Sequence, residues 1–204
     1  MILAGTLSRP ALRRQLRQAR RNLTPLQQRQ AAQGLFRQLA QHPLFRRAKH
    51  IGLYLPNDGE IDPQALIRAA WQRGKSVYLP TLQTWPATHM RFQQFSYKQS
   101  LRKNRFGIAE PVHKPAQQRP AWALDLLLLP LVGFDEHGGR LGMGGGFYDR
   151  SLSYIKRRRQ WHAPPLIGLA HECQKVDQLP MASWDVPMTA CVTERRWYRA
   201  GRST

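Results

Sequence analysis

The sequence predicts an α/β fold in which helices cover both faces of a largely parallel central sheet, so that the domain has three layers (α/β/α). Short apolar segments alternate along the chain with segments of helical periodicity. Segment 124–130 is apolar on both faces, which is typical of a central parallel strand. The 204 residues, 42% of them hydrophobic, suit one domain with a buried core. We expect a single domain over 1–204, with a helical part over 1–45 and an α/β core over 50–195.

Two helices are predicted in the N-terminal part from the residues at which they begin. Ser8 can cap the first helix, with Pro10 in its first turn, and Thr24 followed by Pro25 starts the second helix in the same way. The second helix is expected to end near Pro43. Apolar residues recur at helical spacing in both helices, namely Leu12, Leu16, Ala19, Leu23, Ala31, Leu35, Phe36 and Leu39.

The core is expected to alternate strands with helices. One helix is predicted from Asp62 to Gly74, and another includes Leu152 and has its basic end at 156–159. Residues 96–120 are polar and contain prolines, so we expect mostly loop there. The predicted strands are 51–55, 76–80, 90–95, 124–130, 165–170 and 189–192.

Composition narrows the class of protein. The two cysteines, Cys173 and Cys191, cannot form a disulfide scaffold, and we expect them to be free thiols in a reducing cytoplasm. The longest apolar run, around 126–129, is far shorter than the roughly 20 residues of a membrane helix. With a mean hydropathy of −0.54, the sequence predicts a soluble cytoplasmic protein without a membrane segment.

Positive charge dominates, because Lys and Arg number 32 against 12 Asp and Glu, for a net charge of +20. We expect most basic residues before Asp58 to form solvated helix faces, and one or two to reach an anionic-ligand site. Binding of nucleic acid is an alternative, with an affinity that falls steeply with salt, but no RNA-binding motif with paired aromatics favours it. These residues are Arg9, Arg13, Arg14, Arg17, Arg20, Arg21, Arg29, Arg37, Arg46, Arg47 and Lys49.

The segment 138–149 contains six glycines within nine positions and carries most of the functional information. Glycines let the backbone approach a ligand closely, and successive N–H groups form an anion-binding concavity. Because a buried strand precedes the segment and a helix follows it, we expect it at the carboxyl end of the sheet, where open α/β proteins bind ligands. Its spacing is neither that of a Walker A loop nor that of a dinucleotide-binding loop, so it indicates phosphate without naming the ligand.

Three carboxylates are candidates for the same site. Asp149 closes the glycine-rich segment, and a carboxylate beside phosphate calls for a cation such as Mg²⁺, which Asp185 could share. The alternatives are an N-cap or a salt bridge with Arg150 for Asp149, and a turn before Pro187 for Asp185. Glu60 follows the first predicted strand and could accept hydrogen bonds from a heterocycle. The alternative for Glu60 is simple solvation of a loop residue, and Asp58 and Asp62 compete with it for any role.

With these residues in place, the chain resembles the 5-formyltetrahydrofolate cyclo-ligase (methenyltetrahydrofolate synthetase) family. The motif Phe134-Asp135-x-x-Gly138-x-Arg140-Leu141-Gly142-x-Gly144-x-Gly146-x-Tyr148-Asp149 is highly specific to that family. The likeness runs through nearly the whole chain in order. Its other parts are 9–13, 54–56, 60–61, 106–111, 125–130, 167–170, Gln174 and Asp185.

The resemblance implies an enzyme with a three-layer α/β/α fold that uses ATP and Mg²⁺. Its reaction converts 5-formyltetrahydrofolate into 5,10-methenyltetrahydrofolate, with release of ADP and phosphate. The formyl oxygen is a poor leaving group, and transfer of the γ-phosphoryl group to it makes it a good one. A polyglutamylated form of the folate is a further candidate substrate.

The resemblance also implies the residues of the site. Mg²⁺ is expected at Asp149 and Asp185, and Arg140 and Tyr148 are expected to be catalytic. The folate contacts are expected from Arg13, Leu55, Glu60, Met143, Gly144, Gly145, Gly146 and Phe147. The ATP contacts are expected from Arg9, Pro10, Ala11, Leu12, Arg13, Arg140, Leu141, Gly142, Met143, Gly144, Gly145, Gly146, Phe147 and Tyr148.

Three features depart from the family's pattern. Arg9 stands where members usually have lysine, and it keeps the charge in a planar fork. Phe147 replaces the first tyrosine of a frequent Tyr-Tyr-Asp, which keeps the ring and removes the hydroxyl. A basic residue that some members carry at Met143 or Gly145 is missing. A chain that keeps the fold without the reaction is therefore a third alternative.

Overall fold

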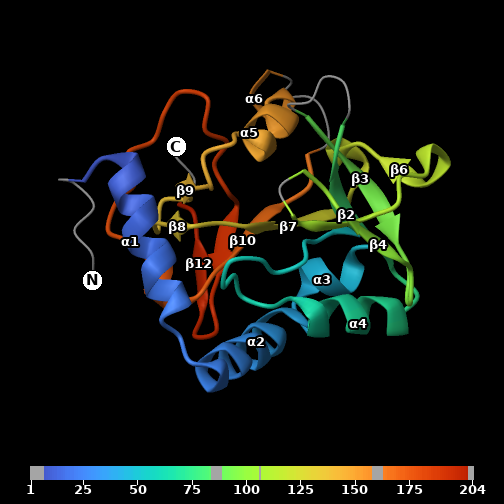
Figure 1. The fold of residues 1–204 in the computed structure, drawn as a ribbon, viewed down its shortest axis with the longest axis horizontal. Helices are drawn as coiled ribbons and strands as arrows, with labels where there is room; N and C mark the ends of the chain where they lie inside the picture. Colours follow the sequence, from blue (N-terminus) through green and yellow to red (C-terminus); the bar gives the residue numbers. More distant parts are fainter. Residues whose placement is uncertain (1–6, 84–88, 106, 158–162, 202–204) are drawn as a thin grey trace.

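An eight-stranded sheet forms the centre of the computed structural model, which describes residues 7–83, 89–105, 107–157 and 163–201 (Figure 1). Its strands are β1 (His50–Gly52), β2 (Ser76–Leu82), β3 (Met90–Phe95), β6 (Gln118–Arg119), β7 (Leu126–Pro130), β10 (Leu166–Leu169), β11 (Ala190–Val192) and β12 (Trp197–Arg199). Their order is β12-β11-β10-β7-β1-β2-β3-β6. The run from β11 to β2 is parallel, and β12, β3 and β6 pair antiparallel at the edges. The predicted largely parallel sheet is therefore confirmed.

Helices cover both faces of the sheet. In Figure 1, α2 (Pro25–Leu39), α3 (Pro43–Arg47) and α4 (Gln64–Gln72) lie below it, and α5 (Phe147–Leu152) and α6 (Tyr154–Arg157) lie above it. An apolar cluster lies on each face of the sheet, and successive residues of a strand belong to opposite clusters. In β7, Leu126 and Leu128 pack on the side of α2 to α4, whereas Leu127 and Leu129 pack on the side of α5. This arrangement confirms the three layers. Among the described helices, none is long and apolar enough to cross a membrane.

Helix α1 (Arg9–Arg21) lies beyond the carboxyl end of β7 and belongs to neither face layer. Its buried residues Leu12 and Leu16 pack on a short hairpin formed by β8 (Gly133–Phe134) and β9 (Arg140–Leu141), and on the segment around Val176. The basic side chains of α1 consequently face the loops that follow the strands.

The starts of the first two helices follow the predicted capping. The Ser8 side chain accepts a hydrogen bond from the N–H of Ala11, and Thr24 forms a capping box with Gln27. Pro43, however, does not simply end the second helix, because the His42 side chain caps a new helix, α3, that buries Phe45. A proline is compatible with the first turn of a helix as well as with the end of the preceding one.

Several strands differ from the prediction. β1 ends at Gly52 and not at Leu55, although the N–H of Leu53 still donates to the carbonyl of Tyr78 at 2.8 Å. The segment 96–120, predicted to be mostly loop, contains a hairpin of β4 (Leu101–Lys103) and β5 (Ala109–Pro111). The two strands do not alternate between apolar and polar residues, so the sequence gives no signal for them. β8, β9 and β12 were not predicted. The helix after the glycine-rich segment divides at Ser153 into α5 and α6, and residues 158–159 of its predicted basic end lie outside the described residues.

Gly34 marks a close contact between α2 and the chain after β11. A Cβ atom at this position would lie 2.7 Å from the backbone oxygen of Glu194 and 3.0 Å from its Cα. Gly34→Ala would stabilise an isolated helix by about 1 kcal/mol, but here the clash is with backbone. We therefore expect this substitution to lower the free energy of unfolding by about 1–3 kcal/mol in chemical denaturation. Gln30→Ala on the exposed side of α2 is the control, and a Gly34→Ala protein as stable as the unsubstituted chain would contradict the packing.

Candidate active site

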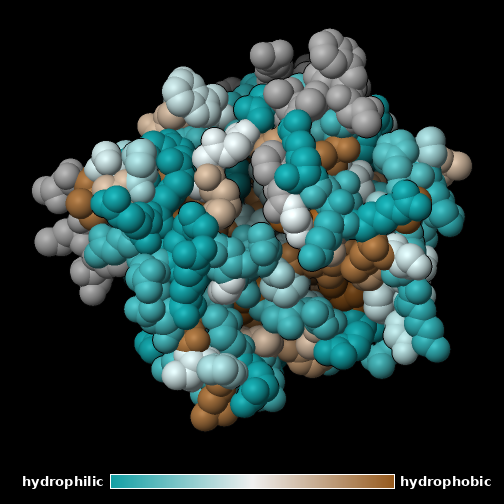
Figure 2. Space-filling view, viewed as in Figure 1, coloured by the Kyte–Doolittle hydropathy of each residue, from teal (hydrophilic) through white to brown (hydrophobic). Residues whose placement is uncertain are grey.

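A cavity of about 510 Å³ opens where β1, β2 and β7 end. The loops after β1 and β7, the end of β2, α1 and the segment 142–149 form its walls, as expected for the carboxyl edge of an open α/β sheet. Figure 2 shows a largely hydrophilic surface, with one group of hydrophobic residues in a hollow to the right of centre and a few others at the edges of the view. The cavity brings together most of the predicted site residues: Arg9, Arg13, Leu55, Glu60, Arg140, Gly142, Met143, Gly144, Gly145, Gly146, Phe147, Tyr148, Asp149 and Asp185.

Four residues of the predicted nucleotide contacts have a different position. Leu12 and Leu141 are buried in the apolar cluster that seats α1 on the β8–β9 hairpin. Pro10 and Ala11, in the first turn of α1, do not belong to the lining of this cavity within the part of the chain that the structure describes. Leu12 and Leu141 therefore pack α1 against the hairpin, and Pro10 and Ala11 form the first turn of the helix that places Arg9 and Arg13 at the cavity.

The glycine-rich segment makes a tight turn into α5 that requires glycine at two positions. Gly144 and Gly146 have φ of +101° and +64°, a region that side-chain-bearing residues rarely adopt. The carbonyl of Gly142 accepts a hydrogen bond from Nε of Arg13 at 2.8 Å, and the carbonyl of Gly145 accepts one from Arg150. The segment is therefore held against α1, and it is not a free surface loop.

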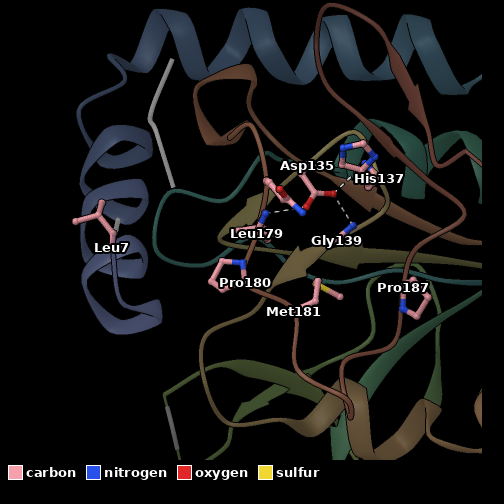
Figure 3. A pocket seen from close by; sticks show the side chains of 9 residues that line it. Leu7, Asp135, His137, Gly139, Leu179, Pro180, Met181 and Pro187 are labelled. Atoms are coloured by element: carbon pink, nitrogen blue, oxygen red, sulfur yellow. Dashed lines mark hydrogen bonds between the residues drawn. The ribbon is translucent and has the colours of Figure 1, made fainter. Parts of the chain in front are cut away.

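Asp135 fixes the hairpin that carries Arg140. Its carboxylate accepts hydrogen bonds from the backbone N–H groups of His137 at 2.9 Å, Gly139 at 2.8 Å and Leu179 at 2.9 Å, as Figure 3 shows beside a second cavity of about 600 Å³. A carboxylate with three backbone donors makes a rigid turn. Since Asp135 lies at the end of β8 and Arg140 at the start of β9, this turn sets the position of the Arg140 guanidinium.

Arg140 and Tyr148 place buried donors at the site. Only 4% of Arg140 is exposed, and its guanidinium carbon lies 5.5 Å from the centroid of the Tyr148 ring. In the described part of the structure, the Arg140 Nε and the Tyr148 hydroxyl are buried without a hydrogen-bond partner. Burial, with the nearby charge of Glu60, raises the pKa of Tyr148 well above its ordinary value, so that it remains a neutral donor. Unpartnered buried donors in a cavity indicate a ligand with acceptor oxygens.

Asp149 and Asp185 come from segments that meet at this cavity. Asp149 pairs with Nη2 of Arg140 at 2.6 Å, and Asp185 pairs with Nη1 of Arg9 at 2.5 Å. The N–H of Val186 donates to the Asp149 carboxylate at 3.3 Å, which brings Asp149 beside the Asp185 backbone. Burial is the largest single influence on the pKa of Asp185 and acts to raise it, but the hydrogen bonds from Arg9 and from the Ala182 N–H, together with the charges of Arg9 and Arg140, outweigh burial and lower that pKa, which keeps the carboxylate charged. Two carboxylates that line one cavity together with arginines are the kind of groups that could hold a divalent cation shared with phosphate.

Glu60 closes a turn after β1. Its carboxylate accepts the N–H of Asn57 at 3.1 Å, and its own N–H donates to the carbonyl of Asn57 at 3.0 Å. The side chain is 12% exposed, and this burial raises the pKa of Glu60 to about 7. A carboxyl group that is buried at the wall of a cavity is available to bind the N–H groups of a ligand, which favours the predicted role over simple solvation.

Arg20 and Trp184 are two of the residues at or beside the cavity that the sequence did not assign to the site. Arg20 is fully buried and lies 3.9 Å from the Glu60 carboxylate, and Trp184 lines the cavity although 70% of it is exposed. The spacing of Arg9, Arg13 and Arg20 along one face of a helix was the available signal for Arg20. For Trp184, no local pattern distinguishes a cavity-lining tryptophan from one on an ordinary loop.

Fold and site together define an α/β protein with one cavity at the carboxyl edge of its sheet, lined by arginines, glycines and carboxylates, an arrangement suited to an anionic ligand. Comparison with known proteins makes the assignment specific. Residues 6–194 match the model of the 5-formyltetrahydrofolate cyclo-ligase family, and the chain belongs to this family. It is thus a member of an enzyme family, as the resemblance predicted.

Curated relatives and solved structures agree with this membership. The chain is 42% identical over 190 residues to a 5-formyltetrahydrofolate cyclo-ligase of Haemophilus influenzae, across 90% of this chain and 96% of the relative. It is 42% identical over 178 residues to that of Escherichia coli K12, across 87% and 96%. The structure of a 5,10-methenyltetrahydrofolate synthetase from Aquifex aeolicus matches with a TM-score of 0.81 and 29% identity, across 97% of this chain and 96% of that chain.

Proposed function

We propose that the protein uses ATP and Mg²⁺ to close 5-formyltetrahydrofolate into 5,10-methenyltetrahydrofolate, through phosphorylation of the formyl oxygen. The relatives named above as 5-formyltetrahydrofolate cyclo-ligases support the reaction. The observation that carries the proposal for this chain is a single cavity whose lining brings Arg140 and Tyr148, each with a buried donor that has no partner among the described residues, together with Asp149 and Asp185. These are the groups that phosphoryl transfer requires.

The nucleotide end of the cavity is assigned to the glycine-rich segment and the start of α1. Backbone N–H groups of 142–146 would receive phosphate oxygens, while Arg9, Arg13 and Arg140 supply positive charge. Arg140 is buried and fixed by the hairpin that Asp135 holds, so its charge is oriented before the ligand binds. Such preorganised donors stabilise the charge that develops on the transferring phosphoryl group.

Asp149 and Asp185 would hold the magnesium ion. Both carboxylates are oxygen donors at the wall of one cavity, and the bond from Val186 N–H keeps them on adjacent segments. When bound, Mg²⁺ would neutralise phosphate oxygens and thus favour departure of ADP. Asp149 and Asp185 would thereby help to orient the nucleotide, and Arg140 and Arg9, which pair with them in this structure, would lie beside the phosphates.

The folate end is assigned to Leu55, Glu60 and the adjoining part of the glycine-rich segment. A carboxylate pairs well with the N–H groups at the edge of a pterin ring, and Glu60 is oriented for this by its bond with Asn57 N–H. Leu55 offers apolar contact beside it, and Arg13 lies between this end and the nucleotide end. The formyl group is thereby brought toward the γ-phosphate.

The reaction then proceeds in two steps. The formyl oxygen attacks the γ-phosphorus, the bond from that phosphorus to the bridging oxygen breaks, and ADP leaves. The neighbouring folate nitrogen next bonds to the formyl carbon and loses its proton, and the carbon–oxygen bond breaks with release of phosphate. The protein forms no covalent bond in either step, so its contribution is positioning and charge stabilisation.

The decisive experiment follows the ultraviolet spectrum of 5-formyltetrahydrofolate with the purified protein. We expect the methenyl product to form only when ATP and Mg²⁺ are both present, with one ADP released for each product molecule. Omission of ATP and addition of a chelator are the two controls. Absence of product under all conditions, in a protein that still binds ATP, would instead support a chain that keeps the fold without the reaction.

A further inference from the structure

Arg20 connects the end of α1 to the turn that carries Glu60. Its side chain is fully buried, and each nitrogen of its guanidinium has a partner. Nε donates to the carbonyl of Asp58 at 2.8 Å, Nη1 to the carbonyl of Leu131 at 2.9 Å and Nη2 to the Asp58 carboxylate at 2.9 Å. Nη2 also lies 3.9 Å from the Glu60 carboxylate. One planar cation therefore links α1, the end of β7 and the turn of residues 57–60.

The turn has a shape that needs external support. Asp58 has a φ of +53°, which is unfavourable for a residue with a side chain, and Gly59 follows it at +74°. The Asp58 backbone and carboxylate are both held by Arg20, and the carbonyl of Gly59 contacts Nε2 of His171 at 3.2 Å. Without Arg20, the turn loses the hydrogen bond to the Asp58 carbonyl and the buried one of the three arginines that hold the Asp58 carboxylate.

The titratable groups around Glu60 come from four parts of the chain. Arg20 faces it from α1, Asp58 from its own turn, and the hydroxyls of Tyr54 and Tyr148 from β1's extension and from α5. Burial raises the pKa of both tyrosines, so they stay neutral, and the three arginines around Asp58 hold the pKa of that carboxyl at about 2 despite its burial. Burial also lowers the pKa of His171, next to the turn, to about 4. Near neutral pH, Glu60 is therefore the group of this set that titrates.

We propose that Arg20 is a positioning residue that locks the turn of residues 57–60 against α1 and supplies the positive charge that the Glu60 carboxylate requires in order to bind the folate. The proposal rests on the proposed role of Glu60 in folate binding. A buried carboxyl group must be ionised to accept two ring N–H donors, and a cation at 3.9 Å favours that form. Arg20 need not touch the substrate for this effect.

The test compares Arg20→Gln with Arg17→Gln. Arg17 donates to the same Asp58 carboxylate at 2.7 Å, but its side chain is 35% exposed. Arg17 therefore makes a similar ion pair with Asp58 without the buried contact to the turn backbone that Arg20 makes. KM for 5-formyltetrahydrofolate and KM for ATP are measured from pH 6 to pH 9. In the unsubstituted protein we expect the folate KM to rise as pH falls through about 7, the pKa of Glu60.

With Arg20→Gln, we expect the midpoint of that profile to move up by about one pH unit, which is about tenfold in folate KM on its acidic side, with little change in KM for ATP. Arg17→Gln is expected to keep the original midpoint. Arg20→Lys restores the charge, so its midpoint should return toward the original even where its KM stays raised. An unshifted midpoint in a folded Arg20→Gln protein overturns the proposal.

Two further variants keep the test decisive. If Arg20→Gln does not fold, Asp58→Asn provides the opposite test, because it removes a negative charge beside Glu60 while asparagine tolerates the left-handed conformation. Its midpoint is expected to move down, and an upward move overturns the proposal. Glu60→Gln tests the role of Glu60 separately from the role of Arg20. If this substitution changes neither the KM for the folate nor its pH profile, Glu60 does not bind the folate.

Discussion

Replacement of Asp149 by alanine is expected to lower the rate of methenyl formation with ATP and Mg²⁺ by about 1,000-fold or more. The carboxylate is one of the two proposed magnesium ligands, and it is also the ionic partner of the buried Arg140 at 2.6 Å. Its removal takes a ligand from the metal and leaves the guanidinium without its carboxylate. The measurement is the rate of product absorbance at saturating folate and ATP over a range of Mg²⁺ concentrations.

Asp149→Asn separates metal binding from folding. Asparagine has nearly the same shape and can still accept the N–H of Val186, which Asp149 accepts at 3.3 Å. We expect this variant to unfold at close to the original temperature and to need much more Mg²⁺ for its remaining activity. A variant with an unchanged rate and an unchanged Mg²⁺ requirement would remove Asp149 from the metal site.

Replacement of Glu60 by glutamine is expected to raise the free energy of unfolding at pH 8 by about 3 kcal/mol. Burial raises the pKa of Glu60 from 4.5 to about 7 in the folded protein. Below pH 4.5 the carboxyl is protonated in both states and has no effect on stability. Between 4.5 and 7 the unfolded chain gives up the proton that the folded chain keeps, so stability falls as pH rises and levels off above 7.

Chemical denaturation at pH 4.5 and pH 8 measures this difference. Glutamine carries no charge at either pH, so the gain should be present at pH 8 and largely absent at pH 4.5. The exposed Glu136, paired with Lys175 at 2.6 Å, provides the control, since Glu136→Gln should give no gain at pH 8. If Glu60→Gln and the unsubstituted protein have the same free energy of unfolding at both pH 4.5 and pH 8, burial of the ionised carboxylate does not destabilise the folded protein.

Local patterns predicted the parts of the fold whose signals lie within one element. The caps at Ser8 and Thr24 act within one turn of helix, and the apolar segment of β7 is buried on both faces, as its sequence indicates. β4 and β12 were missed because neither alternates between apolar and polar residues. Their pairing depends on neighbouring strands, which sequence periodicity does not describe.

The same distinction applies to the site, where some residues can be found from local spacing and others only from the fold. Glycines and acidic residues that lie close together in the chain, as in the segment 138–149, can be recognised from their spacing. Arg20 and Asp58 are 38 positions apart, so their pairing requires the fold. Leu12 and Leu141 lie within motifs of the family, but their side chains pack in the core, because a motif also contains the residues that seat its functional neighbours.

The net charge of +20 has a partial explanation in α1. Several of its arginines contact the site: Arg9 pairs with Asp185, Arg13 with the Gly142 carbonyl, and Arg20 with Asp58. Two of these, Arg9 and Arg13, line the cavity, and their binding of an anionic ligand there stays a prediction. Binding of nucleic acid or of polyglutamylated folate by the remaining basic surface stays a prediction.

The order of contacts along α1 limits how this part of the chain can change. From Arg9 to Arg20 the helix rises about 16 Å, and each of the three arginines meets a different loop. Insertion of a single residue between Arg13 and Arg20 would turn one end of the helix by about 100° relative to the other and carry one set of contacts away from its loop. Outward-facing positions of α1 can vary freely, whereas the number of residues between its arginines cannot.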